Sequence, residues 1–334
     1  MLTALAAIFV FLLVVLVHEA GHFTVAKMVG IRVNEFAIGM GPKLVQKIKG
    51  ETKYTLRALP IGGYVKMEGE DESSNDPRSF SNVSVWSRIA VITAGAIMNF
   101  VLAIVVLSIV AFNVGVPSTT IGEIIDGSPA QEYGIAAGDR IVEIEGVPIN
   151  NWDDIVTTIN TQSPEELLEV QVVRNDEMIS MEVMPTVDEG RVIIGIVPEY
   201  DSGFFTAIKS GFQETWYFLK LMFQFLGMLF QGNVSTNDLA GPVGVINEIG
   251  NAASMGFVSV LYILGFISIN LGFFNLLPIP ALDGSKIVFL LIELFRGKPI
   301  DADKEGFIHF IGFIFLISLM LIVTYKDLIR INLF

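Results

Sequence analysis

The chain alternates long apolar stretches with polar segments. Four stretches approach the ~20 residues that a helix needs to cross a bilayer. Hydrophobic residues make up 52% of the chain and charged residues only 17%, whereas charged residues form about 25% of an ordinary soluble protein. The pattern predicts an α-helical polytopic membrane protein with about four transmembrane helices. The predicted spans cover residues 2–26, 89–112, 256–277 and 306–325.

A series of short strands is predicted directly after the first span. Four apolar or alternating segments, separated by Gly and Pro, indicate a membrane-associated β-hairpin sheet. Such a sheet could lie in the membrane beside the first helix and offer an edge strand to a substrate; the alternative is a cytoplasmic cap over the helix ends. Residues 68–81, rich in Asp, Glu, Ser and Pro, predict a mobile linker. The segments are 33–41, 44–48, 53–59 and 63–67.

Residues 114–203 show the pattern of a small β-rich domain. Strand-like runs in 121–130 and 134–146 are separated by turn signals, and 149–154 leads into a short helix. The pattern is PDZ-like. A PDZ groove binds a chain end or an extended peptide by strand addition. A rigid lid that only excludes bulky molecules is the equally open alternative.

The stretch 204–230 is apolar and aromatic but is broken by Lys209, Glu214 and Lys220. This composition is typical of an amphipathic helix at the membrane interface. A fifth span is the alternative, but it would make the number of crossings odd and would move Asp283 to the wrong leaflet relative to His18.

The net charge of −14 is distributed unevenly and predicts the topology. Residues 114–203 contain 18 acidic and 3 basic side chains, whereas residues 27–88 contain 7 acidic and 10 basic side chains. By the positive-inside rule the basic segment is cytoplasmic, so the acidic domain and the N-terminus are extracytoplasmic. Residue 18 then lies toward the cytoplasmic leaflet, about 25 Å into the first helix.

The sequence His18-Glu19-Ala-Gly-His22 interrupts the first span and matches H-E-x-x-H. Positions i and i+4 share one helix face, so both imidazoles can bind one Zn²⁺ while Glu19 acts on a water molecule. The motif also occurs by chance in soluble helices. Here, however, two of only three histidines lie where each ionisable group costs about 3 kcal/mol. A cleaved signal peptide is disfavoured because no Lys or Arg precedes the apolar run.

A third zinc ligand is expected far along the chain, and Asn275-L-L-P-I-P-A-L-Asp283-Gly is the candidate segment. Its two prolines break a regular helix at membrane depth, which is tolerated only inside protein or beside a wet cavity. With no cysteine in the chain, the ligands must be His and carboxylate. An ordinary Asp-Gly turn is the alternative. Asn270 and Asn275 could bind substrate or satisfy helix carbonyls, and His309 is interpreted as structural or interfacial.

Together the H-E-x-x-H helix, the N-L-L-P-I-P-A-L-D-G segment and the PDZ-like insert resemble the bacterial site-2 protease family, of the regulator-of-sigma-E protease type. The sequence departs from that family at Ser285, where Gly is usual, and in having room for one PDZ module where some relatives carry two. The resemblance implies His18, His22 and Asp283 as zinc ligands and Glu19 as catalytic acid/base. It also supports a substrate-binding role for Asn270, Asn275, Gly63, Tyr64, Val65, Lys66 and Met67.

The expected function is an intramembrane zinc metalloprotease of the bacterial cytoplasmic membrane. Expected substrates are single-pass transmembrane proteins or peptides, such as anti-sigma factors, signal-peptide remnants or pheromone precursors, and no nucleic acid is expected as a partner. A metal transporter or a non-catalytic membrane chaperone is the alternative. One compact ligand set without repeated broken helices disfavours a transporter, and the retained Glu19 disfavours a chaperone.

The predicted domain order follows these features along the chain. It comprises a first transmembrane helix with the motif (1–30), a cytoplasmic-side sheet and linker (31–88), a second transmembrane helix (89–113), an extracytoplasmic PDZ-like domain (114–203), an amphipathic interfacial region (204–255), a third transmembrane helix with the Asp283 segment (256–295), and a fourth transmembrane helix with the C-terminus (296–334).

Overall fold

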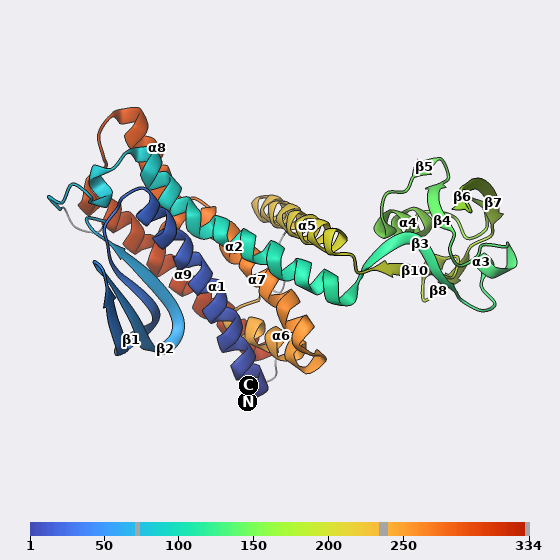
Figure 1. Ribbon diagram of the computed structural model, residues 1–334, viewed down its shortest axis with the longest axis horizontal. Coiled ribbons are helices and arrows are strands. Elements are labelled where there is room, and N and C mark those ends of the chain that lie inside the picture. Colours follow the sequence, from blue (N-terminus) through green and yellow to red (C-terminus); the bar gives the residue numbers. More distant parts are fainter. Residues whose placement is uncertain (71–73, 234–239, 331–334) are drawn as a thin grey trace. The chain divides into compact units, whose positions relative to one another are not determined.

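A computed structural model describes residues 1–70, 74–233 and 240–330 (Figure 1). The chain forms two compact units. The first combines Met1–Val110 with Gly211–Phe334, and the second comprises Ala111–Ser210.

Among the described residues, four helices are long and apolar enough to cross a membrane. Helix α5 (Phe204–Phe230) is not among them, and its interfacial position stays a prediction. The four predicted spans are therefore confirmed as helices. Three of them are a few residues longer than predicted at one or both ends, and the span predicted at 256–277 is one residue shorter at each end. The four helices are α1 (Leu2–Met28), α2 (Val85–Val114), α7 (Phe257–Leu276) and α9 (Ala302–Arg330).

Glycines bring α1, α2 and α7 into close contact. A side chain at Gly21 of α1 would overlap the backbone of Ala94 in α2, and one at Gly272 of α7 would lie 3.0 Å from the Ala96 carbonyl oxygen. Small residues at such crossings are typical of membrane helices, where tight packing rather than the hydrophobic effect drives association. The two shorter helices of this unit are α6 (Pro242–Met255) and α8 (Asp283–Arg296).

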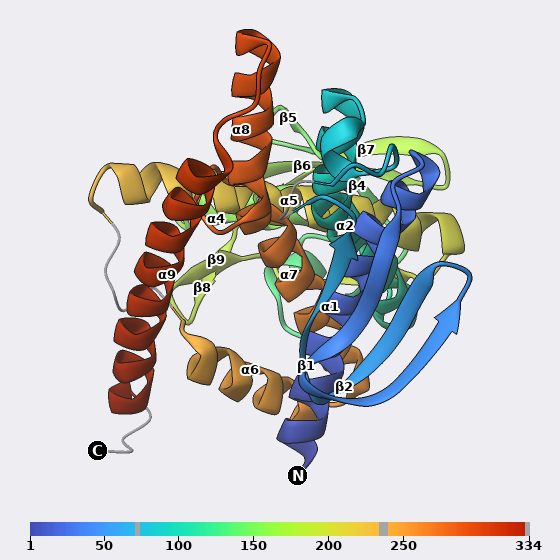
Figure 2. The same cartoon turned by 90° about the vertical axis from the view of Figure 1, so that its left-hand side faces the viewer.

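Strands β1 (Val33–Lys49) and β2 (Thr52–Met67) lie beside α1 (Figures 1 and 2). Their register divides each strand into two segments, which reproduces the four predicted short strands. Residues 33–38 pair on one side with 63–67 and on the other with 53–56, and the latter also pair with 43–49. The segments 43–49 and 63–67 are therefore the two edges of a four-segment sheet.

Helix α1 packs against this sheet through aromatic rings. Phe23 makes edge contacts with Phe36 and Tyr54, with ring centroids 5.2 and 6.0 Å apart. These contacts hold the sheet directly beside the helix that carries the H-E-x-x-H motif.

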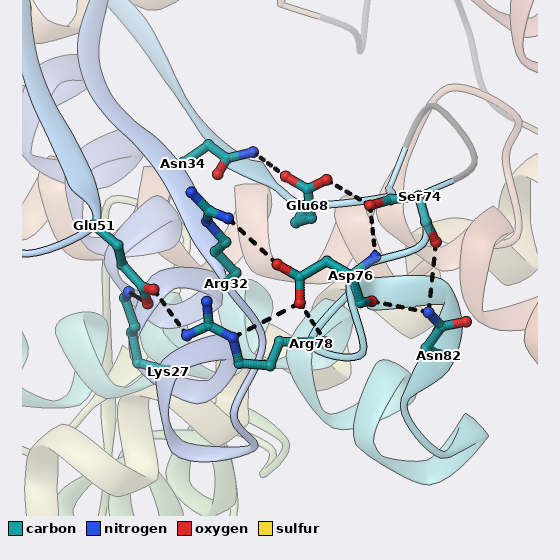
Figure 3. Close-up of polar contacts among 9 residues, drawn as sticks. All are labelled: Lys27, Arg32, Asn34, Glu51, Glu68, Ser74, Asp76, Arg78 and Asn82. Carbon is teal, nitrogen blue, oxygen red and sulfur yellow. Dashed lines mark hydrogen bonds and ion pairs between the residues drawn. The ribbon is translucent and has the colours of Figure 1, made fainter.

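The segment after the sheet is bound to it by polar contacts, as Figure 3 shows. Glu68 accepts hydrogen bonds from Asn34 and Ser74, and Asp76 pairs with Arg32. Acidic and hydroxyl side chains of the predicted linker thus have partners on the neighbouring strand and loop, and its mobility stays a prediction. Residues 71–73 of that predicted linker lie outside the described residues.

Helix α8 is attached to the start of α2 by a largely buried ion pair. The Arg88 guanidinium donates to both Glu293 carboxylate oxygens, at 2.9 and 2.5 Å. Lys286, nearer the start of α8, donates to Glu70 at 2.7 Å. Bidentate pairs such as Arg88–Glu293 fix orientation as well as distance. The two ion pairs therefore fix α8 both near its start and near its end.

The second unit is the predicted PDZ-like module. Its main sheet has the order β10-β3-β4-β6-β7, with β5 paired to β4. Helix α4 begins with a reciprocal capping box between Asn151 and Asp154. The strands and helices are β3 (Val116–Ile124), α3 (Pro129–Glu132), β4 (Arg140–Ile144), β5 (Val147–Pro148), α4 (Trp152–Asn160), β6 (Leu168–Arg174), β7 (Glu177–Val183), β8 (Thr186–Asp188), β9 (Arg191–Ile193) and β10 (Ile196–Asp201).

A buried carboxylate links two parts of this module. Asp139 accepts hydrogen bonds from the Arg174 guanidinium at 2.6 and 2.7 Å and from the Ala136 N–H at 2.8 Å. Burial alone raises the pKa of Asp139, but the bonds from Arg174 and Ala136 outweigh it and hold this pKa below its usual value. Because the folded-state pKa is depressed, the ionised carboxylate stabilises the module above about pH 4, and this stabilisation is lost as the pH falls further.

We expect Arg174→Leu to destabilise the PDZ-like unit by about 1–3 kcal/mol at pH 6, because it leaves the Asp139 carboxylate buried with fewer partners. The difference from the parent should shrink below about pH 4, where Asp139 protonates. Urea unfolding followed by Trp152 fluorescence, in a Trp86→Phe/Trp216→Phe background, measures it. Equal stability of parent and variant at pH 6 would contradict the expectation.

Candidate active site

The two histidines of α1 project from one helix face into the protein interior. His18 and His22 are 7% and 8% exposed, and their Nε2 atoms are 3.2 Å apart. Gly95 of α2 makes room for them, since a side chain there would overlap both imidazole rings. Gly95 was not among the predicted site residues, because only the folded structure shows which glycine faces the rings.

Asp283 reaches the histidines after a break between α7 and α8. Pro278 and Pro280 cannot donate backbone hydrogen bonds, so α7 ends and the chain turns before α8 begins at Asp283. Gly284 must be Gly, because a side chain would overlap the Leu277 carbonyl. Asp283 Oδ2 thereby lies 3.1 Å from His18 Nε2 and 3.4 Å from His22 Nε2.

These three atoms form a triangle that fits a zinc ion. Bonds of about 2.0–2.1 Å in a regular tetrahedron place ligand atoms about 3.3–3.4 Å apart, close to the 3.1–3.4 Å separations between the His18, His22 and Asp283 atoms. Asp283 Oδ2 is buried and has no hydrogen-bond partner among the described residues. A buried oxygen left without a hydrogen-bond donor is what a cation would satisfy.

The outer ring nitrogens of the histidines also have partners. His22 Nδ1 lies 2.8 Å from the Val91 carbonyl, to which it donates, leaving Nε2 free as a ligand. His18 Nδ1 lies 3.3 Å from the side-chain amide of Asn99, which is fully buried in α2. A half-turn of that amide lets Oδ1, otherwise without a partner among the described residues, accept from Nδ1–H.

Asn99 was not among the predicted site residues, although the sequence holds a signal for it. It is the single amide side chain in an otherwise uncharged predicted span, 89–112. The Ser268 hydroxyl donates to the backbone carbonyl of Asn99 at 2.8 Å, which links α7 to this part of α2.

Glu19 lies beside the edge strand of the sheet. A side chain built at Gly63 would be 3.3 Å from Glu19 Cγ and 3.6 Å from Val15. The strand Gly63–Met67 therefore begins beside the H-E-x-x-H motif. Tyr64 on this strand contacts Arg57, which also pairs with Glu35 and so anchors the strand to its neighbours.

The two asparagines of α7 differ in position. Asn275 Nδ2 is 3.4 Å from His18 Nε2, within the site. Asn270 donates instead to the Phe266 carbonyl one turn earlier in its own helix, at 2.8 Å. This is the helix-satisfying alternative considered from the sequence, and no described contact joins Asn270 to the ligands.

A buried His, His and carboxylate cluster with an adjacent Glu, set among membrane-length helices, defines a membrane metallopeptidase. The comparison with protein families agrees: the model of peptidase family M50 matches residues 6–319, and the chain belongs to this family. It is an intramembrane zinc metalloprotease that acts on membrane-anchored substrates, and neither a transporter nor a non-catalytic chaperone is favoured.

Similar proteins span almost the whole chain. The zinc metalloprotease RasP of Bacillus licheniformis is 35% identical over 415 aligned positions, covering 98% of this chain and 99% of the relative. The regulator of sigma-W protease RasP of Bacillus subtilis is 33% identical and covers 98% of both chains. A protein of Clostridium acetobutylicum is 42% identical, covering 97% of this chain and 96% of its own length.

Among solved structures, the PDZ domain of an SdrC-like protein of Listeria monocytogenes is similar to part of this chain. It is 21% identical, covers 25% of this chain and 87% of its own, and has a TM-score of 0.23.

We expect Asn99→Ala to weaken zinc binding by about 10–100-fold, because the His18 ring loses the partner that orients it. Competition with a chromophoric chelator measures the affinity. Ser108→Ala, a change at another polar residue of α2 whose hydroxyl donates to the Ile104 carbonyl of the same helix, is the control and should bind zinc normally. Unchanged affinity in Asn99→Ala would show that this contact does not orient the ligand.

Proposed function

We propose that His18, His22 and Asp283 hold the catalytic zinc and that Glu19 is the general base and acid of peptide hydrolysis. The observation that carries the proposal is the triangle of three ligand atoms, with Asp283 Oδ2 buried and without a hydrogen-bond partner among the described residues. The chemistry of the donor set supports zinc, since two imidazoles and a carboxylate are a known catalytic zinc set.

The residues around the metal divide the reaction between them. Bound zinc supplies polarisation of the peptide carbonyl and a water molecule of lowered pKa. Glu19 accepts the proton of the attacking water and returns it to the leaving amine. Asn275, whose amide lies within 3.4 Å of His18 Nε2, is placed to donate a hydrogen bond to the carbonyl oxygen of the substrate as it becomes negative.

The sheet provides a way to hold an unwound substrate. A transmembrane helix hides its peptide groups in internal hydrogen bonds, and they cannot be left unsatisfied in lipid. Segment 63–67 is a sheet edge that pairs only with β1 among the described strands, and it begins beside Glu19. A substrate segment added to this edge would replace its lost helix bonds while its carbonyl reaches the metal. Gly63, Tyr64, Val65, Lys66 and Met67 form this proposed substrate-binding strand.

The substrate class follows from the setting. We infer a single-pass membrane protein, such as an anti-sigma factor, or a signal-peptide remnant; the name of the Bacillus subtilis relative, regulator of sigma-W protease, supports the first. Within residues 27–88, Lys and Arg outnumber Asp and Glu, which supports a cytoplasmic position of the sheet and an extracytoplasmic PDZ-like unit. The membrane would then be the bacterial cytoplasmic membrane.

We expect Glu19→Gln to abolish cleavage while zinc stays bound, because Gln keeps the shape of Glu but cannot accept the proton. Cleavage of a fluorescent transmembrane substrate in proteoliposomes and metal content by mass spectrometry are measured on the same sample. His18→Ala is the control that should lose both. Activity retained in Glu19→Gln would exclude Glu19 as the base.

We also expect Lys66→Pro to lower cleavage and to weaken its dependence on substrate helix stability, because proline removes a backbone donor from the edge beside Glu19. Helix-breaking Gly or Pro in the substrate weakens its helix by about 1–3 kcal/mol and should speed cleavage by the parent enzyme. Lys47→Pro is the matched control, an exposed lysine on the opposite edge. Equal effects of both prolines would contradict strand capture.

A further inference from the structure

The turn that delivers Asp283 contains a residue in an unusual backbone conformation. Ala281, two positions before Asp283, has φ of +77°. This left-handed region suits Gly and is unfavourable for a residue with a side chain. The strained turn persists only if its surroundings hold it.

A side chain of the last transmembrane helix holds this turn. His309 Nδ1 accepts a hydrogen bond from the Ala281 N–H at 3.0 Å. An Nδ1 that accepts requires the proton to be on Nε2. His309 Nε2 faces the Glu305 carboxylate at 3.8 Å, which suits that tautomer.

A second contact joins the same two segments. Gly312, three residues after His309 and so on the same face of α9, packs against Pro280, and a side chain at Gly312 would overlap the Pro280 backbone and ring. The His309 ring also makes an edge contact with Phe289 of α8, with centroids 5.6 Å apart. Helix α9 thus contacts both the turn before Asp283 and helix α8, which follows that turn.

We propose that His309 is a positioning residue of the zinc site. By accepting a hydrogen bond from the Ala281 N–H, it stabilises the left-handed turn. This turn then places Asp283 Oδ2 next to the two histidine nitrogens. The last membrane helix is therefore part of the machinery that orders the third ligand, although it supplies no ligand itself. The inference rests on the proposed role of Asp283 as a zinc ligand.

The experiment measures metal binding in the full-length protein. Zinc affinity is determined by chelator competition, and the geometry is read from the visible absorption of the cobalt-substituted protein. His309→Ala should bind zinc about tenfold more weakly or worse, with an altered cobalt spectrum. His309→Asn, whose Oδ1 stands close to the position of Nδ1, should bind close to normally. Phe310→Ala, at a 60% exposed neighbour on α9, is the control for general damage to the helix.

A second substitution tests the role of the strained turn. Ala281→Gly removes the side chain that makes the left-handed conformation costly, so it should restore a large part of the zinc affinity that His309→Ala loses. No recovery in the double variant would overturn the proposal, as would normal zinc affinity and a normal cobalt spectrum in His309→Ala. If His309→Ala does not fold, His309→Asn is compared with His309→Gln, whose acceptor is displaced, and equal affinities overturn it.

Asp283→Ala separates this inference from the proposal beneath it. Zinc affinity unchanged in Asp283→Ala would remove Asp283 from the ligand set. Loss of affinity in Asp283→Ala with none in His309→Ala would refute only the positioning role.

Discussion

The cost of burying ionisable groups among membrane helices is the constraint on which this structure depends. Two imidazoles and a carboxylate meet with their ligand atoms 3.1–3.4 Å apart, and the inward-facing carboxylate oxygen lacks a protein donor among the described residues. A lone carboxylate in such a place would be strongly destabilising. A divalent cation bound beside the carboxylate would turn this cost into an attraction. Metal binding and the folding of the α7–α8 turn would then be coupled.

Close backbone packing is what allows the ligands to meet at all. Gly21 brings α1 against α2, Gly95 makes room for both imidazoles, and Gly284 lets α8 start against the end of α7. Each of these positions excludes even a methyl group without movement of its neighbours. The geometry of the site thus depends on glycines at these positions as much as on the ligands themselves. The ion pair of Arg88 and Glu293 separately fixes the far end of α8.

The sequence predicted what depends on local pattern and missed what depends on tertiary contact. The four spans, the short strands and Asp283 follow from apolar length, alternation and helix breaking, and the structure places them as expected. Asn99 is conspicuous in the sequence only as the single amide of its span, and nothing in that span indicates that Asn99 and Gly95 face the His18 ring. For the same reason His309 was interpreted only as structural or interfacial, and the contacts of Glu68 with Asn34 and of Asp76 with Arg32 were not predicted.

The two edges of the sheet differ in a way that explains how an unpaired edge strand can lie beside the proposed site without unwanted pairing elsewhere on the sheet. Unpaired edges invite pairing with other chains, and exposed lysines are a common protection. Lys43, Lys47 and Lys49 line the outer edge, far from Glu19 in the register, whereas the inner edge carries Lys66 alone and has Gly63 against the catalytic helix. Repulsion and desolvation therefore discourage pairing at the outer edge, and the proposed capture of an unwound substrate strand would use the inner edge, which has Gly63 beside Glu19.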